Sequence, residues 1–216
     1  MSYLFYYKNT FNDNISNWDV SNVTNMSNMF YGAIAFNQNL SGWNVSSVTN
    51  MVGLFFGATV FNGDISNWDV SSVTNMASMF ALATVFNGDI SNWDVSNVTN
   101  MFNMFMTASN FNQDISAWDI SNVTNFAYMF YGWSYEAWSP ENRYAIHCAW
   151  QYNDNWYNNG GNSTALGQHA LCGCMDSDAC NYQSYYNGED GSCEYVEDEC
   201  GLCGGSGIAD GACDCD

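Results

Sequence analysis

The residues most suited to metal chemistry lie near the end of the chain. Asp176, Asp178, Asp190 and Glu194 are carboxylate side chains on short stretches rich in glycine and polar residues. Carboxylate oxygens are the ligands that Ca²⁺ prefers in proteins. The EF-hand pattern fails, because Cys180 occupies the fifth position of a motif that would begin at Asp176. These four residues are therefore candidate calcium ligands on loops of another kind.

Cysteines gather at the same end of the chain and indicate its redox environment. Eight of the nine lie between residues 172 and 215, and Cys148 stands apart. Cys200 and Cys203 have C-x-x-C spacing, but neither a second such pair nor a histidine pair completes a zinc site. Short loops without an apolar period need disulfides or metal to hold their shape. We favour disulfides, which indicate an oxidising compartment.

One stretch of this tail has a known likeness. The string "CGLCGG" at 200–205 resembles the thrombospondin-type calcium repeats of extracellular proteins. The resemblance covers only this stretch, and it implies a Cys/Asp-rich extracellular module that uses calcium.

The overall charge limits the classes of partner. The chain has 22 acidic residues against Lys8 and Arg143, a formal net charge of −20 at pH 7. So few cations cannot neutralise phosphates, which argues against nucleic acid as a partner. No apolar run approaches the roughly 18 residues of a membrane span, so we expect no direct membrane insertion. No nucleophile–base pair is apparent, and we expect no enzyme and no catalytic residue.

A 25-residue repeat must position most of the remaining side chains. The string "FNGDISNWDV" stands at 61–70 and again at 86–95. Five units follow one another without an insertion, so the repeat predicts a solenoid in which like residues stack on like residues. The main columns are Phe11, Phe36, Phe61, Phe86 and Phe111; Trp18, Trp43, Trp68, Trp93 and Trp118; and Phe30, Phe55, Phe80, Phe105 and Phe130.

Each unit has two halves with different periods. The I-x-x-W-x-V spacing at 65–70 suits a short strand with one buried face. The V-x-x-M-x-x-M-F spacing at 73–80 suits a helical turn with one apolar stripe. We therefore predict an α/β solenoid, a leucine-rich-repeat-like stack of 25-residue strand-plus-helical-turn units. Columns of asparagine are expected to bond the turn backbone of their own and the next coil.

The repeat also resembles a named family. "FNGDISNWDVSSVTNM" at 61–76 and "FNQDISAWDISNVTN" at 111–125 are similar to the BspA-type surface-protein repeats, also called DUF285. The resemblance covers about residues 1–135 and implies a secreted or surface-attached, non-enzymatic protein linked to adhesion. It brings no catalytic residues and no cofactor for the repeats.

The register of the repeat separates residues 1–135 from the remainder of the chain, 136–216. Residues 1–10 overlay 26–35, so we expect the chain to begin inside a unit and its true start to lie elsewhere. The full units are 11–35, 36–60, 61–85, 86–110 and 111–135.

After Phe130 the register fails, and we expect a helical cap over 136–173. One helix is predicted after Ser139 and a second over 162–173. Cys148 and Cys172 each fall in one of these helices, and we expect a disulfide between them. Seven cysteines then remain, an odd number, so the irregular disulfide-rich module at 174–216 is expected to be truncated.

Two surfaces of the predicted solenoid are candidates for binding. The open strand face is polar and acidic, and it would suit a basic partner, divalent cations or plain solvation. An apolar patch outside the helical stripe would suit association with another copy. The strand-face candidates are Asn17, Asp19, Asn44, Asn67, Asp69, Asn92, Asp94 and Asp119; the patch is Phe56, Phe102, Met106, Tyr128 and Tyr131.

Together these features favour an extracellular or cell-surface binding or adhesion module. Its expected partner is a protein or a glycan at a cell surface or matrix. The alternative is a structural subunit of a surface layer or filament that assembles through the aromatic side.

Overall fold

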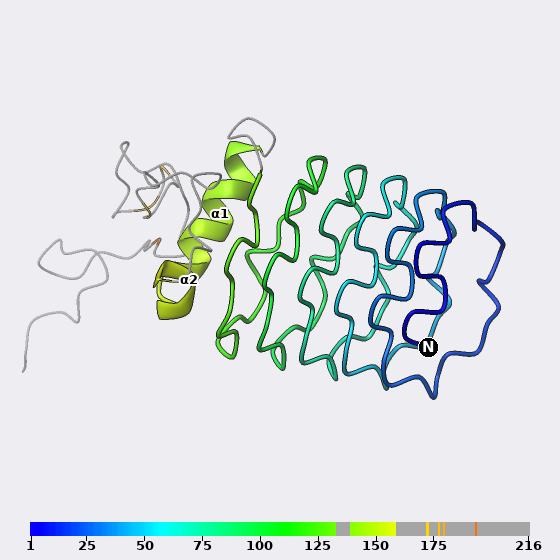
Figure 1. Ribbon diagram of the computed structural model, residues 1–216. Helices are drawn as coiled ribbons and strands as arrows, with labels where there is room; N and C mark the ends of the chain where they lie inside the picture. Colours follow the sequence, from blue (N-terminus) through cyan, green and yellow to red (C-terminus); the bar gives the residue numbers. More distant parts are fainter. Residues whose placement is uncertain (133–138, 159–171, 173–176, 178, 180–192, 194–216) are drawn as a thin grey trace, which may run out of the picture. The chain divides into compact units, whose positions relative to one another are not determined.

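The computed structural model describes residues 1–132 and 139–158, together with residues 172, 177, 179 and 193. The chain divides into two compact units, Met1–Gln168 and His169–Asp216. In the first unit each 25-residue segment forms one coil, and successive coils lie side by side along the stack (Figure 1).

Equivalent residues of neighbouring coils are in contact. Trp43 and Trp68 stack with 6.4 Å between ring centroids and 3° between ring planes. Phe5, in the partial unit at the start of the chain, takes the column of Phe30 at 5.5 Å. The stacking of like residues that the repeat predicts is therefore present. Isolated parallel bridges join one asparagine column, Asn25 to Asn50, Asn50 to Asn75, Asn75 to Asn100 and Asn100 to Asn125.

The predicted fold class, an α/β solenoid of strands and helical turns, is nevertheless wrong. Over the described residues the coils contain neither a strand nor a helix, and the bridges are isolated and form no sheet. Two short helices follow the coils in the described part: α1, Pro140–Trp150, and α2, Asp154–Asn158. Each coil is instead a succession of hydrogen-bonded turns.

The half that we predicted as a strand bends because its backbone closes turns at short intervals. The N–H of Trp68 donates to the carbonyl of Ile65 at 3.2 Å, and the N–H of Val73 donates to the carbonyl of Val70 at 2.8 Å. Such bonds between residues three apart reverse the chain, which leaves no extended run long enough for a strand. The I-x-x-W-x-V spacing, which suggested the alternation of a strand, instead marks the buried residues of successive turns.

The half that we predicted as helical is interrupted by left-handed residues. Ser78 and Leu82 have φ angles of 56° and 60°, outside the region of an α-helix. Alternate N–H groups then face the next coil, as when Ser78 donates to the carbonyl of Phe102 at 2.7 Å. Hydrogen bonds that would lie within a helix therefore join neighbouring coils.

The interior consists of the aromatic and aliphatic columns. Trp68 is 3% exposed, and its indole N–H donates to the carbonyl of Leu40 in the preceding coil at 3.0 Å. Trp18 is 39% exposed, because the partial unit before it has no tryptophan to cover its ring. Burial of each column thus depends on the coil before it and the coil after it.

The residues after the last coil make hydrogen bonds to it that are equivalent to those between two coils. Helix α1 begins as predicted, with Ser139 Oγ accepting the N–H of Asn142 at 3.3 Å. Asn142 Nδ2 donates to the carbonyl of Asn112 at 2.9 Å, as Gln113 Nε2 does to that of Asn87 at 3.0 Å. The predicted helix over 162–173 lies outside the described residues apart from Cys172, and α2 was not predicted. None of the helices in the described ranges has the length and hydrophobicity needed to cross a bilayer.

Candidate binding surfaces

Short side chains hold the turns of each coil. In the unit 61–85, Asp64 Oδ1 accepts the N–H of Ser66 at 3.0 Å and its hydroxyl at 2.7 Å. Asp69 Oδ1 accepts the N–H of Ser71 at 3.1 Å and its hydroxyl at 2.6 Å. Each carboxylate thereby closes a local turn that the backbone would otherwise leave open.

These turns repeat in every unit and form two columns of acidic or amide side chains. The 64 column consists of Asn14, Asn39, Asp64, Asp89 and Asp114. The 69 column consists of Asp19, Asn44, Asp69, Asp94 and Asp119.

The predicted strand-face residues are exposed, but they do not lie on a strand face. Asp19, Asn44, Asp69, Asp94 and Asp119 are the turn residues of the 69 column, and Asn17, Asn67 and Asn92 are exposed two positions earlier in their units. The prediction of a strand face is wrong because the coils have no strand. The 64 column was missed as a candidate surface, although the D-x-S spacing that marks it occurs twice in each of the units 61–85, 86–110 and 111–135.

Hydrogen bonds from the serines lower the pKa of several turn carboxylates. The hydroxyl of Ser96 and then its N–H lower the pKa of Asp94. The N–H of Ser121 and then its hydroxyl lower the pKa of Asp119, although the charge of Asp94 acts in the opposite direction. The stacking of like charges that we expected to be unfavourable is therefore outweighed at Asp119 by the turn itself. In the 64 column, Asp64 and Asp89 have their pKa lowered mainly by their serines.

A band of apolar side chains runs along another side of the stack. The predicted patch residues Tyr128 and Tyr131 are 55% and 59% exposed, and Phe56, Phe102 and Met106 are partly buried. The patch is longer than predicted, because Tyr6 and Tyr31 occupy the same repeat position as Phe56, Met106 and Tyr131. We define the apolar band as Tyr6, Tyr7, Tyr31, Phe56, Leu82, Phe102, Met106, Tyr128 and Tyr131.

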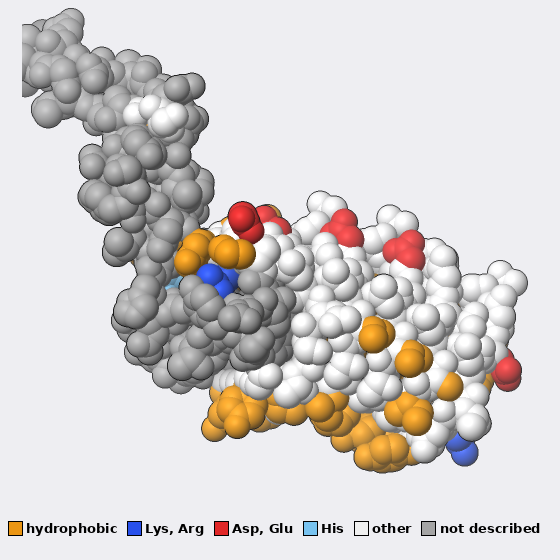
Figure 2. All heavy atoms as spheres, turned by 90° about the horizontal axis from the view of Figure 1, so that it is seen from above, with side chains coloured by type: hydrophobic (Ala, Val, Ile, Leu, Met, Phe, Trp, Pro, Cys, Tyr) orange, Lys and Arg blue, Asp and Glu red, His pale blue; other side chains and the backbone are white. Residues whose placement is uncertain are grey.

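The two kinds of surface are separated. In Figure 2, hydrophobic side chains gather along one edge of the stack, and acidic side chains project mainly from the opposite edge, with further charged side chains at one end of the stack. The coil therefore presents an apolar band and a charged edge to different directions.

The apolar band contains a notch over Gly57, next to Gly32, which the ring of Tyr7 covers. The hollow has a volume of about 330 Å³ and no charged side chain in its lining. A Cβ added to Gly57 would meet nothing nearer than 3.9 Å, so the floor of the notch is open above this residue. The lining consists of Tyr7, Asn9, Tyr31, Gly32, Ile34, Phe56, Gly57 and Leu82.

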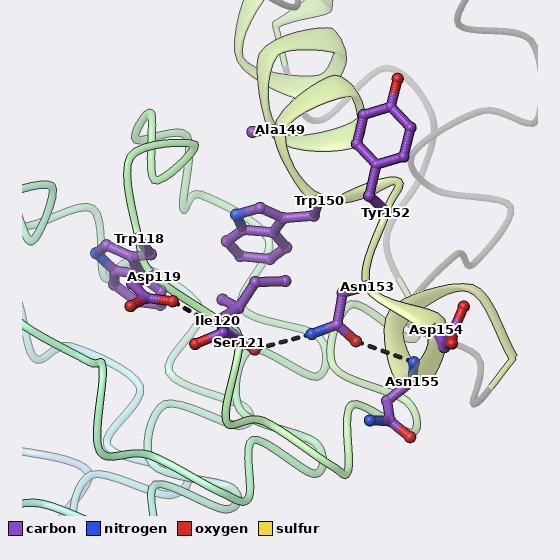
Figure 3. A pocket seen from close by; sticks show the side chains of 10 residues that line it. All are labelled: Trp118, Asp119, Ile120, Ser121, Ala149, Trp150, Tyr152, Asn153, Asp154 and Asn155. Carbon is purple, nitrogen blue, oxygen red and sulfur yellow. Dashed lines mark hydrogen bonds between the residues drawn. The ribbon is translucent and has the colours of Figure 1, made fainter.

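A second hollow, of about 510 Å³, lies between the last coil and the cap. Asp119 lies on one side of it and Tyr152 and Asp154 on the other (Figure 3). Asn153 joins the two sides, donating from Nδ2 to the carbonyl of Ile120 at 2.8 Å. The lining of this pocket includes two carboxylates and no cation, so it fits a positively charged group better than an anion. Asp119 is the one predicted site residue that it contains.

Most of the candidate site residues in the cysteine-rich tail lie outside the described residues. Asp176, Asp178, Asp190 and Glu194, the candidate calcium ligands, lie outside the described residues, as does the thrombospondin-like stretch. In the described part no three His, Cys, Asp or Glu side chains cluster as metal ligands would. Cys148, Cys172 and Cys193 are each disulfide-bonded, whereas the pairing of Cys148 with Cys172 stays a prediction.

Comparison with known proteins identifies the repeat region. Residues 1–71 and 43–139 match a family model described as Mycoplasma protein of unknown function, DUF285. No curated protein and no solved structure matches the chain.

Proposed function

The chain belongs to the DUF285 family, and we propose that it is a non-enzymatic binding module of the BspA type, exposed outside the cell, that engages a basic partner along its acidic edge. The observation that carries the proposal is the 69 column, in which exposed carboxylates occupy one repeat position of successive coils. The expected partner is a protein with lysine- or arginine-rich surface at a cell surface or matrix.

The geometry supports a basic partner in three ways. The carboxylates are fixed by their serines, so little side-chain freedom is lost on binding. Hydrogen bonds from the serines lower the pKa of Asp94 and of Asp119, so both carboxylates stay charged further into the acid range. The pocket beside the cap extends the 69 column at Asp119 and adds Asp154 and the exposed ring of Tyr152, which suit a cationic side chain.

Location outside the cell is part of the same proposal. Disulfides at Cys148, Cys172 and Cys193 support it, because such bonds persist in oxidising compartments. Calcium in the tail remains a proposal of its own, carried by the carboxylates of 176–194.

The proposal can be tested without disturbing the turns. Asn44 already takes the place of an aspartate in the 69 column, accepting the N–H of Ser46 at 3.2 Å and its hydroxyl at 2.7 Å. Replacing Asp69, Asp94 and Asp119 together by asparagine should therefore remove charge and keep the fold. We expect the affinity for a labelled lysine-rich peptide, measured by fluorescence anisotropy, to fall about tenfold or more.

A matched variant distinguishes binding at the 69 column from a general effect of the net negative charge. Asparagine at Asp64, Asp89 and Asp114 makes the same charge change in the 64 column. A clearly smaller loss in this variant supports the 69 column as the binding row. Equal losses in both variants, or tighter binding of heparin than of the peptide, would contradict the proposal.

Self-assembly is the second candidate function, and the apolar band favours it. The band runs over the coils and carries several exposed tyrosines, and other exposed apolar side chains such as Val60 and Val85 lie outside it. Large exposed apolar patches commonly mark contacts with other proteins.

A further inference from the structure

The shape of the apolar band points to its partner. We propose that the band is the interface of an antiparallel, two-fold symmetric dimer of this chain, in which Tyr128 and Tyr131 of each copy enter the notch over Gly57 of the other. The proposal is independent of the basic partner, since it uses a different side of the coils.

The lining of the notch is suited to receiving aromatic side chains. One wall is the stacked pair of Tyr31 and Phe56, with 4.2 Å between ring centroids, and Leu82 also lines the notch. Tyr7 and Leu82 keep exposed, bulky side chains at φ angles of 53° and 60°, the left-handed conformation that this repeat position has throughout the coils. The notch therefore has an apolar floor and raised apolar rims.

The other end of the same band supplies a projecting group. Tyr128 and Tyr131 are packed edge to face with 5.6 Å between their centroids. They are more than half exposed and belong to the last coil of the stack. A pair of rings that support one another loses little freedom when it is buried, which suits it as an anchor in an interface.

Two-fold symmetry brings both pairs together at once. The notch extends from Tyr7 in the partial unit to Leu82 in the third full unit, and the tyrosine pair is in the fifth. When two bands meet antiparallel, the tyrosine pair of each copy faces the notch of its partner, so the interface is self-complementary.

Electrostatics select this face for contact between two copies. Each chain has a formal charge of −20, so most surfaces of one copy repel those of another. The residues of the apolar band are uncharged, and acidic side chains project mainly from the opposite edge (Figure 2). Contact through the band thus keeps the charged edges apart, and we expect added salt to strengthen the dimer by screening the remaining repulsion.

Sedimentation equilibrium of the full chain tests the proposal. Tyr131→Ser removes part of the projecting group. Gly57→Asn fills the notch with a residue that tolerates positive φ, at a repeat position where Leu82 already has this conformation. Each variant should weaken dimerisation about tenfold or more. Tyr152→Ser is the matched control, since Tyr152 is 84% exposed but lies beside the cap pocket, and it should leave the dimer unchanged.

Mixing the two weakened variants separates a lost contact from a lost fold. A mixed dimer contains one intact pair, formed by the tyrosines of the Gly57→Asn copy and the notch of the Tyr131→Ser copy. The mixture should therefore associate more tightly than either variant alone. A monomeric wild type, association that neither variant weakens, a dimer that weakens with added salt, or a mixture no tighter than its components would overturn the proposal.

Discussion

Trp118 and Trp150 lie ring to ring, with 6.4 Å between centroids and 21° between planes, although one belongs to the last coil and the other to helix α1. The cap thus continues the tryptophan column of the coils with a residue from a different element. Trp150 also packs edge to face with Trp156 of α2 at 5.0 Å, so both helices cover the end of the stack.

Loss of Trp150 should open this end. We expect Trp150→Ala to lower the free energy of unfolding by about 3–5 kcal/mol, the usual range for a buried tryptophan. Urea unfolding followed by fluorescence measures the change. An effect within about 0.5 kcal/mol, as at a surface site, would show that the cap does not seal the stack.

Position in the stack should set the cost of losing a tryptophan. Trp68 is 3% exposed and its indole N–H is hydrogen-bonded, so Trp68→Ala should lower the free energy of unfolding by about 3–5 kcal/mol. Trp18, 39% exposed, should cost clearly less in the same substitution. Equal losses of stability in the two variants would contradict the stacking of coils as the source of burial.

Acid should weaken the turns. The folded pKa of Asp64, Asp89, Asp94 and Asp119 is lowered from 3.8, mainly by bonds from the serines. Their contribution to stability is therefore complete above about pH 4 and is lost as the pH falls through the folded pKa values.

Thermal unfolding between pH 2 and 5 measures this loss, within about the range where carboxylates titrate. A variant with asparagine at all four positions should show a flatter decline of melting temperature towards low pH. A decline as steep as that of the wild type would assign the acid sensitivity to other groups.

Left-handed residues should be places where glycine stabilises the coil. Ser78 has a φ angle of 56°, and Gly53 occupies the same repeat position in the preceding unit. Relief of the Cβ clash should make Ser78→Gly more stable by about 0.5–1 kcal/mol, after the added freedom of the unfolded chain is subtracted. Ser78→Ala keeps the Cβ and should bring no gain; a gain in that variant instead of the glycine one would refute the explanation.

The 25-residue register was predictable from the sequence because identical residues in a fixed period have to meet their counterparts. It placed Trp68 beside Trp43 and Phe5 beside Phe30 correctly. The N-terminus of α1 was also predictable, because Ser139 and Pro140 are local signals of a helix start.

The backbone between the columns was not predictable from hydrophobic spacing. Three-residue spacings such as Met76 to Met79 fit a helix and a chain of turns equally well, and the positive φ of Ser78 has no clear signal in a serine. The acidic columns were assigned to a strand face for the same reason. The hydrogen bonds from Ser66 and Ser71 show that the D-x-S repeat was the better guide.

Contact between equivalent residues of adjacent coils underlies both proposed surfaces, and a double-mutant cycle measures it most directly. Trp68 and Trp93, 6.3 Å apart at their centroids, are each replaced by leucine, alone and together. We predict a coupling energy of about 0.5–1.5 kcal/mol for this pair. For Trp43 and Trp93, which Trp68 separates, the coupling should stay within about 0.5 kcal/mol of zero. Equal coupling in the two pairs, or none in either, would contradict the stacking of coils on which both surfaces depend.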